Sequence, residues 1–170
     1  MGGQCWGMKY KIRQEKEGDE NAIKDVVARA FEGKPYADEN DPLIVERLRA
    51  DASLVLSLVA VAGKQIIGQV ALSPAKIGDL KYLAVGPLAV LPEHQRKGIG
   101  SDLMGHALGV AQAYGRDGVV LQGDLNYYSR FGFEKMSSVT YDGQGADYIQ
   151  VLPFTDAPSG PLTFHPVLSG

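Results

Sequence analysis

The chain has 170 residues, of which 45% are hydrophobic and 22% are charged, enough for one globular domain with a substantial core. Its formal net charge of -3 provides no concentrated basic surface for a phosphate backbone, so we expect no nucleic-acid partner. No apolar run approaches the length of a membrane span, and the single cysteine, Cys5, excludes an internal disulfide, so no membrane partner and a cytoplasmic location are expected.

The first seven residues read Met-Gly-Gly-Gln-Cys-Trp-Gly and lack both the charged start and the apolar centre of a signal peptide. Met8 would make a natural start, so we expect residues 1–7 to be a leader or a cloning remnant. The remaining sequence has no internal repeat and no linker composition. Residues 8–170 are therefore expected to form a single domain.

In chain order, the first expected elements are a strand over Lys9–Arg13 and a helix that follows Asp19 as its N-cap. The apolar residues of this helix follow helical spacing and are Ile23, Val26, Val27, Ala30 and Phe31. Gly33–Glu39 has a loop composition. The Asp-Pro pair at 41–42 then predicts the cap and first residue of a second helix, which runs to Leu48.

Two β-rich runs, Leu54–Val61 and Gln65–Leu72, flank Ala62-Gly63-Lys64 and predict a hairpin. Pro74 is expected to close the second run. A third run covers Tyr82–Leu91.

Pro87 lies inside the third run. Proline cannot donate to a sheet ladder, so Pro87 indicates a bulge or a strand side that faces no neighbour. We favour an opening of the sheet at this point over an ordinary edge irregularity.

The rest of the chain is expected to alternate helix and strand. The expected elements are a helix over Gly98–Tyr114, a strand over Val119–Leu121, a short helix over Asn126–Phe131, and a closing strand pair, Ser137–Tyr141 with Tyr148–Leu152. Residues 153–170 are rich in Pro, Gly and Ser and are expected to form a surface tail. The order β-α-α-β-β-β-α-β-α-β-β predicts a three-layer α/β domain with a mixed sheet.

Gln95–Gly100, which reads Gln-Arg-Lys-Gly-Ile-Gly, lies where the third strand run passes into an amphipathic helix. A glycine-rich turn at a helix start favours phosphate, because free N–H groups and the positive end of the helix dipole face the ligand. A mononucleotide P-loop would need a lysine where Ser101 stands. A dinucleotide site would need a third glycine where Leu103 stands.

This pattern resembles the motif Gln/Arg-x-x-Gly-x-Gly/Ala of the GNAT superfamily of N-acetyltransferases. Gly86–Gln95, Leu121–Asp124 and Tyr127–Phe133 are similar to a strand and turn, a later strand and a Tyr-containing turn of its YhbS-like branch. The similarity covers most of the chain from about Tyr10 onward. It implies an α/β, three-layer GNAT-type (acyl-CoA N-acyltransferase) fold, with a mixed, mostly antiparallel central sheet splayed at the coenzyme site.

The resemblance also implies that the chain binds acetyl-CoA as its acetyl donor. The backbone of Leu88, Ala89 and Val90 is expected to meet the pantetheine and the thioester carbonyl, where an N–H stabilises the oxyanion. The pyrophosphate is expected on the N–H groups of Gln95, Arg96, Lys97, Gly98, Ile99, Gly100 and Ser101. The side chains of Arg96 and Lys97 either add charge there or are simply solvated.

In the family pattern a tyrosine lies five residues before the Phe of a Gly-Phe pair, and that position is Tyr128 here. Its phenol is expected to protonate the departing CoA thiolate as a general acid. Tyr127 is the rival, and because adjacent residues on a helical turn point about 100° apart, at most one of the two faces the sulfur. Many relatives also carry an Asn after the coenzyme helix. Asp124 and Asn126 are the candidates here, and neither transfers by position.

The general base is not identified by the pattern. Many relatives place a glutamate on the strand before the phosphate turn, but Tyr82–Pro87 contains no carboxylate. Glu46, Asp38, Glu39 or a water held by backbone carbonyls are the alternatives. No metal site is expected from the three scattered histidines, His94, His106 and His165.

Two functions from different classes are left open. The leading hypothesis is an enzyme that transfers acetyl from acetyl-CoA to a primary amine of a small molecule or protein by direct attack in a ternary complex. No cysteine lies near the site, which argues against an acetyl-cysteine intermediate. The alternative is a non-catalytic GNAT-fold module that binds acyl-CoA or a partner. The identity of the amine acceptor and the formation of a homodimer are also left open.

Overall fold

The computed structural model describes residues 4–5, 8–35 and 37–169, and the chain divides into two compact units. The first unit is Met1–Leu72 with Pro87–Ala107, and the second is Ser73–Gly86 with Leu108–Gly170. The expected single domain over residues 8–170 stays a prediction.

Antiparallel strands of the first unit include β3 (Lys11–Gln14), β4 (Leu56–Ala62) and the first part of β5 (Gln65–Ile77). β4 and β5 join through a tight turn at Gly63, where φ is 62°, so the predicted hairpin is confirmed. β1 (Gln4–Cys5) pairs with β2 (Met8–Lys9) ahead of this sheet, and the other residues of the expected leader lie outside the described residues.

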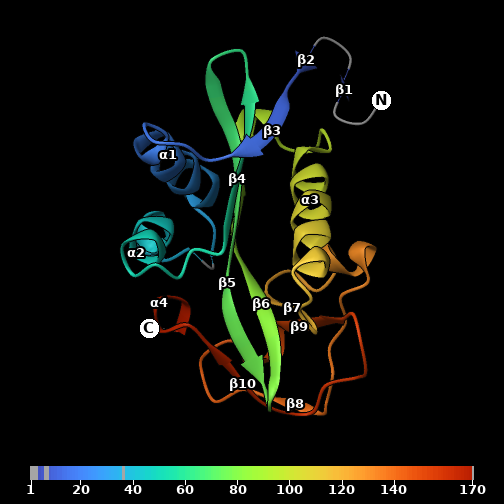
Figure 1. Cartoon of the computed structure of the whole chain (residues 1–170). Helices are drawn as coiled ribbons and strands as arrows, with labels where there is room; N and C mark the ends of the chain where they lie inside the picture. The colour runs from blue at the N-terminus through green and yellow to red at the C-terminus, as the bar shows by residue number, and fades with distance from the viewer. Residues whose placement is uncertain (1–3, 6–7, 36, 170) are drawn as a thin grey trace. The chain divides into compact units, whose positions relative to one another are not determined.

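Helices cover this sheet on both sides (Figure 1). α1 (Glu20–Phe31) and α2 (Ile44–Ala50) lie on one side, and α3 (Ile99–Ala113) lies on the other. The buried side chains of α1 and α2 are Ile23, Val26, Val27, Ala30, Val45 and Leu48. α3 packs closely on β5, since a Cβ at Gly68 would lie 3.0 Å from Leu103 Cδ1. The expected three-layer arrangement is therefore present in this unit.

The two helix starts differ from the expected caps. Asp19 precedes α1, but its carboxylate accepts hydrogen bonds from Arg13 Nη1 at 2.7 Å and from the Lys16 N–H at 2.8 Å. The hydrogen bond from Arg13 lowers the pKa of Asp19. Residues Asp41–Leu43 form a 3-10 turn, η1, before α2, and the Asp41 carboxylate also accepts a backbone N–H of the preceding loop. In both places the carboxylate stabilises the preceding chain instead of the helix end.

The second unit holds the other strands, with part of β5 and β6. Their bounds are β6 (Leu80–Val90), β7 (Gly118–Gln122), β8 (Val139–Thr140), β9 (Ile149–Pro153) and β10 (Gly160–Phe164). β7 pairs with β6 in parallel and with β9 in antiparallel. The hydrogen-bonded order is β3-β4-β5-β6-β7-β9. The expected mixed, mostly antiparallel sheet is confirmed. Short helical turns complete the unit, namely η4 (Ala146–Tyr148) and α4 (Pro166–Ser169).

The parallel register between β6 and β7 is short. It pairs Tyr82 with Gly118 and ends where Ala84 meets Val120. β6 nevertheless continues to Val90, and β7 continues to Gln122 while still paired with β9. The β6–β7 ladder therefore ends at Ala84, before Pro87, where the sequence predicts that the sheet opens.

Three expectations for this part of the chain are wrong. Pro74 does not close β5, which runs to Ile77. β5 pairs with β4 as far as Leu72 and with β10 from Ala75 onward. Pro74 lies between these two ladders, so its missing N–H removes no hydrogen bond from either of them. Residues 153–170 do not form a surface tail, because Leu162 and Phe164 of β10 are buried in the core. β8 pairs with β10 instead of with β9.

Gly118→Ala tests the packing of the second unit. A Cβ at Gly118 would lie 2.5 Å from Tyr82 Cε2 and 2.6 Å from Leu152 O, so we expect the unfolding free energy to fall by about 2–3 kcal/mol. Gly109→Ala is the control, since a Cβ there meets nothing within 4 Å and alanine favours a helix by about 1 kcal/mol. Urea unfolding measures both, and equal stabilities would contradict the proposed close packing.

Candidate functional site

The end of β6 and the start of α3 are joined by a turn that lies wholly in the first unit. Leu91 donates its N–H to Ile67 O at 2.9 Å. The 3-10 turn η2 (Pro92–His94) follows. Gln95 then directs its side chain back to the strand, with Nε2 2.9 Å from Val90 O. This hydrogen bond ties the last residue of β6 to the residues that precede α3.

The backbone after Gln95 presents N–H groups that the helix does not use. φ is positive at Arg96 (63°) and at Gly98 (86°). The first helical hydrogen bond runs from the Asp102 N–H to Gly98 O at 3.0 Å, so the amides through Ser101 precede the ladder of α3. A Cβ at Gly98 would meet nothing within 4 Å, which leaves room for close approach. Such a helix start suits an anion.

The residues whose backbone is predicted to bind the coenzyme differ in burial. Ala89, Val90 and Ile99 are buried. Leu88, Gln95, Gly100 and Ser101 are half-buried, and Arg96, Lys97 and Gly98 are exposed. Ile99 Cγ2 would lie 3.3 Å from a Cβ at Gly68, so this side chain packs α3 onto the sheet. What Ile99 can offer a ligand is its backbone N–H.

Two side-chain contacts that the sequence did not predict stabilise the turn between β6 and α3. Arg29 Nη2 on α1 lies 3.0 Å from both carboxylate oxygens of Glu93. Tyr10, just before β3, donates its hydroxyl to Asp102 Oδ2 at 2.5 Å. The partners are 64 and 92 residues apart, so no local sequence pattern could have connected them.

The tyrosine segment belongs to the second unit. Tyr128 begins the 3-10 helix η3 (Tyr128–Phe131) and is half-buried. Its ring packs edge-on against Phe133, with centroids 6.2 Å apart. A Cβ at Gly123 would lie 2.6 Å from Tyr128 Cε2. Glycine at that position therefore makes room for the tyrosine ring directly after β7.

Tyr127 is held by other contacts. Its ring stands at 88° to that of Tyr128, with centroids 4.9 Å apart. The guanidinium carbon of Arg130 lies 4.4 Å from the Tyr127 centroid, a cation–π geometry. Arg130 Nε also donates to Tyr127 O at 2.9 Å. Tyr127 is therefore held through Arg130, whereas the Tyr128 ring packs against Phe133.

The chain between β7 and η3 is fixed by polar side chains. Asp124 Oδ1 accepts the N–H groups of Asn126 at 2.7 Å and Tyr127 at 3.1 Å, which closes an Asx-type turn. Gln150, only 1% exposed, donates Nε2 to the carbonyls of Gly123 and Asp124, each at 3.2 Å. Asp124 is therefore engaged in positioning the tyrosine segment. Gln150 gave no sequence signal, because a glutamine in a strand is common.

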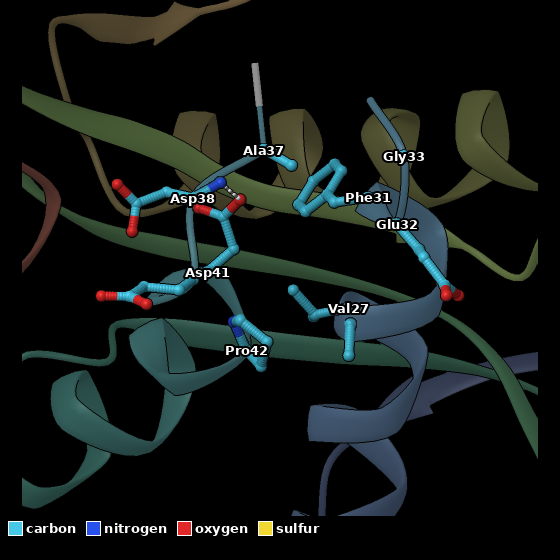
Figure 2. Close-up of a pocket in the computed structure, with 10 residues that line it drawn as sticks. Val27, Phe31, Glu32, Gly33, Ala37, Asp38, Asp41 and Pro42 are labelled. Atoms are coloured by element: carbon cyan, nitrogen blue, oxygen red, sulfur yellow. Dashed lines mark hydrogen bonds between the residues drawn. The ribbon is translucent and has the colours of Figure 1, made fainter. Parts of the chain in front are cut away.

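A pocket of about 270 Å³ lies in the first unit, between the end of α1 and the loop before η1 (Figure 2). Asp38 and Glu39, two of the carboxylates considered as the general base, line this pocket, and so does Asp41. Burial, with a smaller contribution from Asp38, raises the pKa of Asp41. Glu46 is outside the pocket and lies 3.9 Å from Lys24 Nζ on the surface.

The histidines have separate local contacts. His94 Nδ1, at the end of η2, is buried without a hydrogen-bond partner in the described part of the chain. His106 Nδ1 lies 2.9 Å from Asp102 O. Over residues 4–5, 8–35 and 37–169, no group of three or more His, Cys, Asp or Glu could hold a metal ion. Among those same residues, no helix is both long and apolar enough to cross a membrane.

Comparison with known sequences finds acetyltransferase relatives. Residues 54–135 match the acetyltransferase (GNAT) domain. The uncharacterised N-acetyltransferase YhbS of Escherichia coli (strain K12) is 36% identical over 126 residues, which are 72% of this chain and 72% of YhbS. The uncharacterised N-acetyltransferase YjhQ of the same strain is 30% identical over 125 residues, which are 69% of this chain and 66% of YjhQ.

Solved structures of related proteins share the fold. A GNAT family acetyltransferase from Brucella melitensis, in complex with acetyl-CoA, has a TM-score of 0.83 and 36% identity, covering 95% of this chain and 99% of that chain. YhbS from Escherichia coli, in complex with CoA, has a TM-score of 0.86 and 28% identity, covering 95% of this chain and 93% of that chain. These similarities confirm the fold class predicted from the sequence.

Gln95→Ala removes the hydrogen bond to Val90 O. We expect the unfolding free energy to fall by about 1 kcal/mol, the net contribution of a typical hydrogen bond, and the amides after residue 95 to exchange faster with solvent. Gln112→Ala, at an exposed position of α3, is the control and should change stability by no more than about 0.5 kcal/mol. If urea unfolding and hydrogen exchange give the same result for both variants, the turn does not depend on this hydrogen bond.

Proposed function

Because this chain belongs to the GNAT family of acetyltransferases, we propose that it transfers an acetyl group from acetyl-CoA to a primary amine by direct attack in a ternary complex. The observation that carries the proposal is the start of α3, where the amides through Ser101 precede the helical ladder and the space above Gly98 is open, an arrangement that suits a pyrophosphate. Relatives with the same fold hold acetyl-CoA or CoA. The acceptor amine belongs to a small molecule or a protein. The cytoplasmic location and a homodimer stay predictions.

We assign the pyrophosphate to the backbone N–H groups of residues 95–101, of which the Gln95 N–H also donates to Pro92 O at 3.4 Å. Two features support this assignment, namely the left-handed backbone at Gly98 and the open space above it. Arg96 and Lys97 are exposed beside this turn, so their charges are favourable for a phosphate but partly screened by solvent and salt. The backbone is therefore the main ligand in this proposal.

We assign the pantetheine and the thioester carbonyl to the backbone of Leu88, Ala89 and Val90. An extended chain with amide groups can pair with a strand as an added neighbour, and the β6–β7 register ends at Ala84, before this stretch. The side chains of Ala89 and Val90 are buried, which leaves the backbone as the polar part. One N–H at the thioester carbonyl is worth about 2.7–4 kcal/mol to the transition state in comparable acyl transfers.

In this reaction the neutral amine nitrogen forms a bond to the acetyl carbonyl carbon, and the carbon–sulfur bond breaks. CoA leaves as a thiolate and gains a proton, and the nitrogen loses one to water or to a carboxylate such as Asp38 or Glu39. We assign the proton donor for the sulfur to Tyr128. The position of Tyr128, five residues before Phe133 of the Gly-Phe pair, supports the choice of Tyr128 over its neighbour.

CoA release with a panel of primary amines tests the proposed activity, together with a thermal-shift measurement of acetyl-CoA binding. We expect acetyl-CoA to raise the melting temperature and at least one amine to be acetylated with equal release of CoA. Binding without turnover on any amine would favour the alternative, a non-catalytic GNAT-fold binding module. The feature in favour of that alternative is the lack of a carboxylate in Tyr82–Pro87.

Gly100→Val tests the pyrophosphate assignment. A β-branched side chain at the helix start blocks close approach of a phosphate to the backbone, so we expect acetyl-CoA affinity to fall by roughly tenfold or more. Gly105→Val is the control, because it makes the same change in the same helix where a Cβ meets nothing within 4 Å. If calorimetry gives equal affinities for Gly100→Val and the parent chain, the pyrophosphate binds elsewhere.

Tyr128→Phe tests the proton donor. The phenol acts on the leaving sulfur late in the reaction, so kcat should fall while acetyl-CoA affinity stays nearly unchanged. We expect a loss near the low end of the usual range for general acids, about 10²-fold or less, because a CoA thiolate is already a fair leaving group. Tyr127→Phe is the matched control. Equal losses in both variants, or a loss of affinity alone, would assign Tyr128 to packing or binding.

A further inference from the structure

Two acidic residues flank the turn that we assign to the pyrophosphate. Glu93 lies in η2, before the turn, and Asp102 lies in the first turn of α3, after it. A carboxylate close to a bound phosphate raises the free energy of the complex, because like charges repel. The contacts that hold these two carboxylates therefore affect how well the turn can bind a coenzyme.

Asp102 is placed to compete with the coenzyme. A helical side chain points toward the N-terminus of its helix and covers the turn before its own Cα. For Asp102 that turn is Gly98–Ser101, whose amides precede the helical ladder. Aspartate readily accepts backbone N–H groups at a helix start. A mobile Asp102 carboxylate would therefore occupy the donors that we assign to the pyrophosphate.

The structure directs this carboxylate to another donor. Tyr10, between β2 and β3, donates its hydroxyl to Asp102 Oδ2 at 2.5 Å. Both side chains are half-buried, and a hydrogen bond to a charged group is stronger than one between neutral groups. The Tyr10 hydroxyl thus holds a negative charge that would otherwise be drawn to the positive end of the α3 dipole.

Glu93 is held in a weaker way. Arg29 Nη2 lies 3.0 Å from both of its carboxylate oxygens. Both side chains of this ion pair are exposed, at 40% and 48%, so solvent and salt screen it. The contact between Tyr10 and Asp102 is therefore the one from which we expect the larger effect on the coenzyme.

We propose that Tyr10 is a positioning residue for acetyl-CoA. Its hydroxyl holds the Asp102 carboxylate away from the amides of residues 99–101, so that the pyrophosphate meets these amides without competition from that carboxylate. Tyr10 acts through Asp102 and not by touching the coenzyme. This assignment rests on the proposed function, and in particular on the pyrophosphate site at the start of α3.

A purely structural role for this hydrogen bond predicts a different pattern. If Tyr10 and Asp102 only brace the start of α3, removal of either partner loosens the turn and weakens coenzyme binding. If Asp102 is a competitor that Tyr10 restrains, removal of Tyr10 alone weakens binding and removal of Asp102 restores it. The two roles thus differ in the sign of the effect at Asp102.

Calorimetry with acetyl-CoA on the full chain distinguishes these roles. We expect Tyr10→Phe to weaken binding by roughly fivefold or more, and Asp102→Ala to bind at least as tightly as the parent chain. The double variant should match Asp102→Ala within about twofold, as expected for residues that act as a unit. Tyr114→Phe, at a position 56% exposed after α3, and Asp25→Ala, at an exposed position of α1, are the matched controls and should bind like the parent chain.

Hydrogen exchange without ligand gives a second measurement. In Tyr10→Phe the freed carboxylate should slow exchange of the amides of residues 99–101, whereas loss of a brace would speed it. Asp102→Ala alone keeps the test decisive if Tyr10→Phe does not fold.

Three results would each overturn the role of Tyr10 and leave the proposed function standing. The first is an equal affinity of Tyr10→Phe and the parent chain, and the second is a loss in Tyr10→Phe that Asp102→Ala does not restore. The third is weaker binding by Asp102→Ala alone. Failure of the parent chain to bind acetyl-CoA would overturn both proposals.

Discussion

The start of α3 depends on the hydrogen bond from Gln95 Nε2 to Val90 O. It holds the end of a strand beside the start of a helix, so the amides at residues 98–101 keep a fixed direction before any ligand arrives. Arg29 on α1 and Tyr10 beside β3 add braces to the same turn through Glu93 and Asp102. A site built on strand and helix ends, with side chains from separate elements supporting it, is preorganised. Arg96 takes a left-handed conformation in this turn, which a non-glycine residue adopts only where its surroundings require it.

The second unit fixes its tyrosine segment by different means. Gly123 leaves space for the Tyr128 ring, the Asp124 carboxylate closes the turn before it, and the buried Gln150 amide holds the carbonyls of the same turn. A glycine, a short acid and an amide thus define the position of one aromatic side chain. The contacts of Arg130 keep the adjacent Tyr127 in a separate role.

The sequence predicted the structure correctly where neighbouring residues determine it. The hairpin at Gly63, the strand-turn-helix around Gln95 and the helix of Val26 and Val27 all follow from spacing within a few residues. It failed where a distant partner decides the outcome. The Asp19 carboxylate accepts a hydrogen bond from Arg13 and does not cap its helix. Residues 160–164 form the strand β10 because β5 pairs with them. The alternation of Leu162 and Phe164 was a period-two signal for this strand. The pocket beside α1 brings Phe31 and Asp41 together from different elements, so no single motif could have revealed it. Tyr128 was identified by family resemblance, since nothing in its local sequence separates it from Tyr127.

The pairing of β10 with β5 has a consequence for how the chain is made. One edge of Ala75–Ile77 pairs with residues 162–164, so on the ribosome this strand edge stays unpaired for several seconds at translation rates of about 5–20 residues per second. During that interval the places of Leu162 and Phe164 in the core are empty, and an apolar strand edge is open to other chains. Premature termination before Leu162 would make this exposure permanent. The second unit therefore has a window of aggregation risk during synthesis that its finished structure does not reveal.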